Sequence, residues 1–240
     1  DLWRVDVTCE QSSPEQLTTA PYADSSPVFS PDGRHIAYTS SVSAGLPVYA
    51  IPQLAILDVV TGSSRLVESL AEIQALNIRY AAGGRSILAI TEFRGEQQLV
   101  RVDLGSGATE RIIAGQEVVT EFDAARDGRL FAVVSRPQSP AEVFRLVDGG
   151  LQQFTAVNRE LLAGTQTGAV EKHTYAVADG TVLDSFVVFP PGFQKGRRYP
   201  AVLHIHGGPW AQWDWRFDSE SQLFAAQGYD GQQDLYRASW

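Results

Sequence analysis

The stretch that decides the fold is YPAVLHIHGGPW, residues Tyr199 to Trp210. Its apolar run, Ala201 to Ile205, is typical of a central β-strand that is buried on both faces. Pro200 stands at the strand start, where a missing N–H is tolerated, and Gly207 and Gly208 follow the run. Because glycine has no side chain, these two residues allow backbone angles and close approaches that other residues block. The stretch therefore predicts a buried strand that leads into a loop with accessible backbone N–H groups.

A loop of this kind resembles one half of the oxyanion hole in α/β-hydrolases. There the loop after the third strand offers a backbone N–H to the oxygen that becomes negative during acyl transfer. An ordinary glycine turn after a strand is the alternative interpretation. The residues His206, Gly207 and Gly208 alone do not distinguish the two.

The flanking sequence favours the first interpretation. FVVFPPGF, residues 186–193, precedes the stretch, and LFAAQGY, residues 223–229, follows it. In this order the three segments resemble the start of the hydrolase domain in the prolyl oligopeptidase family, and most of all its acylaminoacyl-peptidase and dipeptidyl-peptidase branch. The resemblance extends over residues 170–229 and depends on several motifs in a fixed order. The polar tail from Asp230 to Trp240 departs from the family pattern, which continues with a hydrophobic strand.

An internal repeat precedes this region. Four strand-like segments, LWRVD, LAILD, LVRVD and FRLVD, end on the aspartates Asp6, Asp58, Asp103 and Asp148. Successive aspartates are 52, 45 and 45 residues apart, which is typical of a four-stranded propeller blade. Turn signals such as Asp32-Gly33 and Asp127-Gly128 lie upstream of matching strands. A β-sandwich with regular hairpins is the alternative, but a sandwich would not be expected to repeat one signature.

Together these patterns predict the fold class and the domains. We expect a partial β-propeller of about three to four blades over residues 1–155. The N-terminal part of an α/β-hydrolase domain is expected to follow over residues 156–240.

Composition and charge narrow the range of functions. Hydrophobic residues make up 44% and charged residues 20% of the chain, which is typical of a soluble globular protein. No apolar run approaches the ~20 residues of a membrane-spanning helix. The net charge of −9 argues against a nucleic-acid partner, which requires a basic face. We therefore expect no nucleic-acid partner, no membrane insertion and no cofactor, and leave a homo-oligomer open.

The cysteine and histidine residues carry few further signals. The single cysteine, Cys9, allows no internal disulfide and favours a reducing compartment, so we expect a cytoplasmic protein. A periplasmic or secreted location stays open, because a leader could precede Asp1. His204 and His206 face the same side of a strand, which is compatible with a metal site, but no Asp, Glu or Cys lies nearby in the sequence to complete it. We expect no metal.

The catalytic residues of an α/β-hydrolase are missing from this sequence. It contains no Gly-x-Ser-x-Gly nucleophile elbow, and no histidine follows His206. By resemblance, the nucleophile, the acid and the base lie beyond residue 240. The chain also contains no methionine, so we expect it to be part of a longer protein and to be inactive alone.

The resemblance implies a serine peptidase, an exopeptidase on short or N-acylated peptides that works through an acyl-enzyme. The matching loop makes Gly208 the N–H donor, Gly207 the residue that shapes the turn and His206 a support for the loop. Trp210 and Trp213 follow at once and are candidates for an apolar substrate subsite, with core packing as the alternative. Two other functions remain open: an esterase or lipase, and a propeller that acts as a protein-binding module.

Overall fold

A computed structural model covers residues 1–240 and describes all of them except residues 10–11, 42–49, 72, 126, 208–210 and 235–240. The chain divides into two compact units. The first comprises Asp1–Glu92, Leu99–Ile112 and Asp123–Leu130, and the second comprises Phe93–Gln98, Ile113–Phe122 and Phe131–Trp240. This division reflects compactness alone, and the domain boundary near residue 155 stays a prediction.

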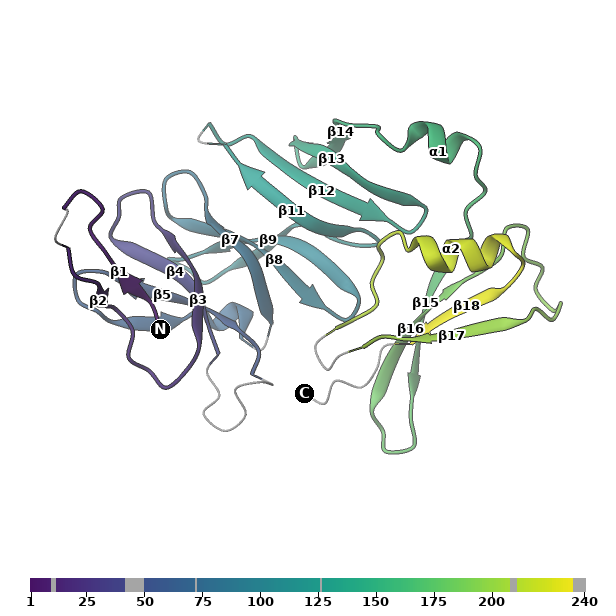
Figure 1. Cartoon of the computed structure of the whole chain (residues 1–240), viewed down its shortest axis with the longest axis horizontal. Coiled ribbons are helices and arrows are strands. Elements are labelled where there is room, and N and C mark those ends of the chain that lie inside the picture. Colours follow the sequence, from purple (N-terminus) through teal and green to yellow (C-terminus); the bar gives the residue numbers. More distant parts are fainter. Residues whose placement is uncertain (10–11, 42–49, 72, 126, 208–210, 235–240) are drawn as a thin grey trace. The chain divides into compact units, whose positions relative to one another are not determined.

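Most of the chain consists of groups of four sequential strands that pair in chain order (Figure 1). A short antiparallel ladder precedes them, formed by β1 (Trp3–Arg4) and β2 (Glu15–Gln16). The first group contains β3 (Asp24–Phe29), β4 (His35–Ser40), β5 (Gln53–Asp58) and β6 (Ser64–Leu66). After a 3-10 turn at Glu68–Leu70, the second group contains β7 (Gln74–Tyr80), β8 (Ser86–Phe93), β9 (Glu96–Asp103) and β10 (Thr109–Ile113). The third contains β11 (Val118–Ala124), β12 (Leu130–Arg136), β13 (Ser139–Val147) and β14 (Gly150–Gln153).

The second and third groups form one eight-stranded sheet because a single parallel bridge, between Val118 and Gln97, joins β11 to β9. A repeated four-stranded unit is what the sequence repeat predicts. The structure describes three such groups. Their closure into a propeller stays a prediction.

Two of the four recurring aspartates, Asp58 and Asp103, are the last residues of their strands and cap the turns that follow, whereas Asp6 lies two residues after β1. Asp58 is the last residue of β5, and its Oδ1 accepts hydrogen bonds from the N–H groups of Val60 and Thr61, both at 2.8 Å. Asp103 is the last residue of β9, and its Oδ1 accepts the equivalent hydrogen bonds from the N–H groups of Gly105 and Ser106, at 3.1 and 2.8 Å. This is the local chemistry that favours aspartate in turns. Asp148 departs from it, because it follows β13 and takes a left-handed φ of 49° at the start of the next turn.

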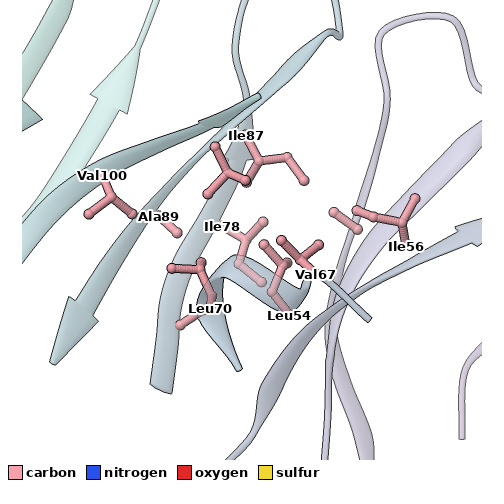
Figure 2. Packing of buried hydrophobic residues seen from close by; sticks show 11 residues of the cluster. Leu54, Ile56, Val67, Leu70, Ile78, Ile87, Ala89 and Val100 are labelled. Carbon is pink, nitrogen blue, oxygen red and sulfur yellow. The ribbon is translucent and has the colours of Figure 1, made fainter. Parts of the chain in front are cut away.

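The core of the first unit lies where the first two groups of strands pack together. Buried side chains from β4 and β5 meet those from β7, β8 and β9, and Figure 2 shows several of them converging. The cluster consists of Ala37, Leu54, Ile56, Val67, Leu70, Ala75, Ile78, Ile87, Ala89, Val100 and Val102. Alternation along the strands supplies this face, since every second residue points to the same side.

The second unit contains a different sheet, built from the last strands of the chain. Its strands are β15 (Val170–Ala176), β16 (Val182–Val188), β17 (Ala201–Ile205) and β18 (Asp230–Asp234), in the order β15-β16-β18-β17. β17 runs parallel to β18, whereas β16 is antiparallel to both β15 and β18. The polar tail from Asp230 therefore supplies a strand inside this sheet. None of its described strands pairs with β1 to β14, as predicted for the strand Ala201 to Ile205.

A helix, α2 (Ser219–Ala226), connects β17 to β18 and packs against β16 and β18 (Figure 1). Parallel strands need a crossover of this kind. The helix begins at Asp218, whose carboxylate accepts a hydrogen bond from the N–H of Ser221 at 2.7 Å. A shorter helix, α1 (Arg159–Ala163), precedes β15. Within the described residues, neither helix has the length and hydropathy that a bilayer crossing requires.

The strand prediction for residues 201–205 is confirmed, but the prediction that it is central and buried on both faces is wrong. Among the described strands β17 lies at the edge of its sheet, and its side chains alternate between half-buried and exposed. Leu203 and Ile205 are 56% and 51% exposed. The apolar composition favours a strand, yet it does not state how many neighbouring strands the chain supplies.

Candidate functional site

The predicted oxyanion loop begins directly after β17, at the carboxyl end of a strand that runs into a helix crossover. His206 and Gly207 are described, whereas the predicted donor Gly208 and the predicted subsite residue Trp210 lie outside the described residues. The roles assigned to all four therefore stay predictions. In open α/β sheets, ligands bind outside the carboxyl ends of parallel strands, which is where this loop lies.

The His206 ring contacts the backbone of the loop. Its Nδ1 lies 2.8 Å from the carbonyl oxygen of Gly207. Because a carbonyl oxygen only accepts hydrogen bonds, Nδ1 is the protonated ring nitrogen and donates this hydrogen bond. This contact fixes the ring against the first glycine of the pair.

The described surroundings of Gly207 do not require a glycine at this position. Its φ lies outside the left-handed region, and a Cβ built on it would meet nothing within 4 Å. Among the described residues nothing requires glycine at position 207, and its role in shaping the turn stays a prediction. The open space beside Gly207 leaves its flank unobstructed by described residues.

The segment after the loop, residues 212–218, forms hydrogen bonds to two other parts of the second unit. The side chain of Gln212 accepts a hydrogen bond from the N–H of Gly95 at 2.8 Å and donates one to the carbonyl of Glu96 at 3.4 Å. The N–H of Phe217 donates to Oγ of Ser135 at 2.9 Å. These bonds fix the backbone that leads from the loop into α2.

An ion pair stiffens the middle of this segment. Asp214 is buried, and its carboxylate accepts hydrogen bonds from the guanidinium of Arg216 at 2.5 to 3.0 Å. Arg216 also donates to the side-chain carbonyl of Gln97 at 3.3 Å. A bidentate arginine–carboxylate contact is among the stronger hydrogen-bonded pairs. It satisfies a carboxylate that would otherwise be buried without a partner.

The tryptophans of this segment pack into a small core. Trp215 meets Phe186 edge to face with ring centroids 5.0 Å apart, and Val118 completes the cluster. Trp213 packs against the same cluster and against the ring of His204, at 4.7 Å between centroids. Its buried Nε1 has no hydrogen-bond partner in the described structure. These contacts favour the core-packing alternative for Trp213, and its role as a substrate subsite stays a prediction.

Asp184 on β16 is a buried carboxylate with several charged and polar partners. It is 3% exposed and binds Arg94 through two bonds of 2.9 and 2.8 Å, Lys172 at 3.1 Å and Thr174 at 2.5 Å. Burial opposes the charged form, but the bonds from Arg94, Thr174 and Lys172 outweigh it and lower the pKa of Asp184. The network connects the turn at Arg94 to the sheet that carries β17.

Gln222 on α2 makes a further buried connection. Its amide accepts from the N–H of Gly168 at 2.6 Å and donates to the carbonyls of Gly168 and Pro137, both at 3.2 Å. Gly168 has no room for a side chain, because a Cβ would lie 2.1 Å from the carbonyl oxygen of Phe189. This contact orders the entry to β15 against the helix that follows the loop.

The described residues contain no group of three or more His, Cys, Asp or Glu side chains that could hold a metal ion. His204 instead meets the ring of Trp213, and His206 meets the carbonyl of Gly207. The pair therefore has contacts of its own that do not involve a metal.

Comparisons with known proteins agree with the local architecture. Over 210 residues, 86% of its length, the chain is 30% identical to dipeptidyl-peptidase 5 of Porphyromonas gingivalis. This match supports the resemblance of the chain to the prolyl oligopeptidase family. Over 48% of its length it is also 28% identical to the uncharacterized peptidase YuxL of Bacillus subtilis. No family model matches it.

Among solved structures, the acylaminoacyl peptidase of Pyrococcus horikoshii has a similar fold. It aligns with 94% of this chain at a TM-score of 0.75 and 20% identity. The chain spans only part of these proteins. It covers 30% of the P. gingivalis relative, 18% of the B. subtilis relative and 34% of the P. horikoshii chain.

Several residues that shape this site carry no signal in the sequence alone. Arg94, Asp184 and Gln212 come from three distant segments and match no motif. The only local signal is the dipeptide Arg94-Gly95, which a hairpin turn between two strands would favour.

Proposed function

We propose that this chain supplies a partial β-propeller, over residues 1–155, and the first part of an α/β-hydrolase domain, over residues 156–240, to a serine peptidase. The repeated four-stranded groups and the peptidase relatives support the first part. The observation that carries the second is the position of His206 and Gly207. They follow directly on a strand that crosses over through a helix to its parallel neighbour, and Gly208 is the next residue in the sequence.

The proposed substrates are short peptides from which the enzyme removes residues at the amino end. The relatives named above are called dipeptidyl-peptidase and acylaminoacyl peptidase, which supports an exopeptidase on short or N-acylated peptides. A solved complex of an acylaminoacyl peptidase with a peptidyl chloromethyl ketone has a similar fold, at a TM-score of 0.75. A peptide substrate therefore agrees with the names of these proteins.

In the proposed mechanism a serine outside these 240 residues attacks the peptide carbonyl, and the loop after β17 stabilises the oxyanion that forms. The N–H of Gly208 is the proposed donor. Gly207 shapes the approach to it, and His206 supports the loop through its bond to the Gly207 carbonyl. Backbone donors suit this task because they are fixed before the charge develops.

Two other functions are less well supported. An esterase or lipase would use the same loop, but the named relatives are peptidases and the chain carries a repeated β-sheet region that a free-standing esterase does not need. A protein-binding module would leave the loop without a task. A serine that reacts with mechanism-based probes separates these two classes of function.

The test is labelling with a fluorophosphonate, which reacts with activated serines, followed by mapping of the labelled residue. In the protein as it is naturally expressed, we expect one labelled serine outside residues 1–240, and peptides with a free or acylated amino end should compete with labelling. The 240 residues alone should not react. A labelled serine within residues 1–240, or no labelling of the natural protein, would contradict the proposal.

A further inference from the structure

The turn between β8 and β9 belongs to the second unit, together with the loop after β17. Its central residues, Arg94 and Gly95, both take left-handed φ angles, 49° and 79°. This pair of angles is what a tight two-residue hairpin turn requires. The turn therefore presents the N–H of Gly95 and the carbonyl of Glu96 to its surroundings in a fixed geometry.

The turn is packed tightly against the segment that follows the loop. A Cβ on Gly95 would lie 2.6 Å from Cζ of Phe186 and 3.1 Å from the carbonyl oxygen of Trp213. The turn can approach this closely only because residue 95 has no side chain. Its N–H then reaches Oε1 of Gln212 at 2.8 Å, and its next carbonyl accepts from Nε2 of the same side chain.

The turn is also bonded to two strands of the last sheet, β15 and β16. Arg94 binds both oxygens of the buried Asp184, and the ammonium of Lys172 donates to the carbonyl of Arg94 at 2.5 Å. These bonds connect the turn to β15 and β16. Gln212 therefore bonds to a turn that is itself held in place. Gln212 stands five residues after Gly207, so few backbone bonds separate this support from the loop.

We propose that Gln212 is a positioning residue, which holds the loop of Gly207 and Gly208 in place by bonding to the backbone of the β8–β9 turn. This inference rests on the proposed function, because it assigns the loop a task in the transition state. β17 ends just before the loop, and Gln212 is the first residue after it with described bonds to the β8–β9 turn. Oxyanion donors must be held within a fraction of an ångström of the productive position, so their supports affect the rate.

The test measures peptide hydrolysis by the natural protein and its variants. Gln212→Leu keeps the approximate volume and removes both bonds, and we expect kcat to fall about 10- to 100-fold with KM changed by no more than about twofold. Gln212→Glu keeps an oxygen that can accept from the N–H of Gly95 and should recover most of kcat. The matched control is Gln152→Ala, because Gln152 is exposed on β14 and should leave both constants unchanged.

A double variant links the effect to the loop. If Gln212 acts through the donor of Gly208, Gln212→Leu should lower kcat less in a Gly208→Ala background than in the natural protein. If the Leu variant does not fold, Gln212→Asn carries the test, because its amide is one methylene shorter and should lower kcat in the same way.

The outcomes separate this inference from the proposed function. Suppose that Gly208→Ala still slows the reaction. The positioning role alone is then overturned if folded Gln212→Leu or Gln212→Asn variants keep the natural kcat, or if the Glu variant is as slow as the Leu variant. If neither Gly208→Ala nor the bulkier Gly208→Val lowers kcat, the loop is not an oxyanion hole, and the proposed role of the loop fails together with this inference.

Discussion

At the residue scale, Asp184 shows how one carboxylate connects distant parts of the chain. Its partner Arg94 is 90 residues away in sequence, and both of its oxygens accept from that guanidinium. We expect Asp184→Asn to destabilise the chain by about 1.5–3 kcal/mol, because the amide leaves two cations without their counter-charge. Chemical denaturation at neutral pH, with the free energy of unfolding compared to the natural sequence, measures this effect.

The pH dependence of the same difference is a second readout. Folding lowers the pKa of Asp184 from its ordinary value of 3.8, so the stabilisation is complete above that value. It is lost as the pH falls through the lower pKa of the folded state. The difference between the natural sequence and Asp184→Asn should therefore shrink at acidic pH. A difference that stays constant down to pH 2 would show that the charge of Asp184 does not stabilise the fold.

Asp230, at the start of β18, is expected to behave in the opposite way. Burial raises its pKa, and its Oδ1 is buried without a hydrogen-bond partner among the described residues. A raised pKa means that the ionised carboxylate destabilises the folded state. This loss of stability develops as the pH rises through the pKa of the folded state. Asp230→Asn should therefore raise the melting temperature at pH 7 and change it little at pH 3. A lower melting temperature at pH 7 would reveal a favourable contact of the charged form.

At the element scale, the turn between β8 and β9 depends on a single glycine. Gly95→Ala would force a left-handed φ on alanine and push its Cβ to 2.6 Å from Phe186. We expect a loss of about 1–3 kcal/mol in the free energy of unfolding, since strain and overpacking each have this magnitude.

The control for this turn is Gly164→Ala. Gly164 has a φ of −102°, and a Cβ there would meet nothing within 4 Å. This variant should change stability by less than about 0.5 kcal/mol in a thermal or denaturant titration. If both alanine variants were equally stable, the close contact of Gly95 with Phe186 would not constrain the fold.

The elements differ in how far the sequence predicts them. The strand at Ala201–Ile205 and the strands that end at Asp58 and Asp103 follow from local patterns. The edge position of β17 does not, because strand order depends on pairing between distant segments. The polar strand β18 was also missed, since Asp230–Asp234 lacks the apolar residues that indicate a strand.

The candidate site divides in the same way. The loop of His206 and Gly207 is visible in the sequence because glycine and strand signals are local. Its supports are not, because the bond of Gln212 to Gly95 spans 117 residues and neither residue belongs to a motif. A side-chain amide that bonds to a distant turn leaves no trace in composition or periodicity.

At the scale of the whole molecule, the chain combines a repeated β-sheet region with the start of a sheet that has a parallel crossover. In the proposed function the second region supplies a backbone donor, and the first belongs to the propeller that the repeat predicts. The family relationship was predicted from ordered motifs around the double glycine. It is supported by 30% identity over 210 residues to dipeptidyl-peptidase 5 of P. gingivalis.

The central claim is that the loop after β17 stabilises an oxyanion, and the kinetics of Gly208→Ala in the natural protein test it most directly. A donor that acts only in the transition state affects kcat and not ground-state binding. Alanine keeps the backbone N–H and acts only by displacing it, so the account predicts that kcat falls by up to the about 10²–10³-fold that a fully lost donor costs, while KM stays nearly constant. Gly164→Ala serves as the matched control and should keep both constants. A folded Gly208→Ala variant with the natural kcat and a raised KM would contradict the account, because the loop would then shape a binding pocket.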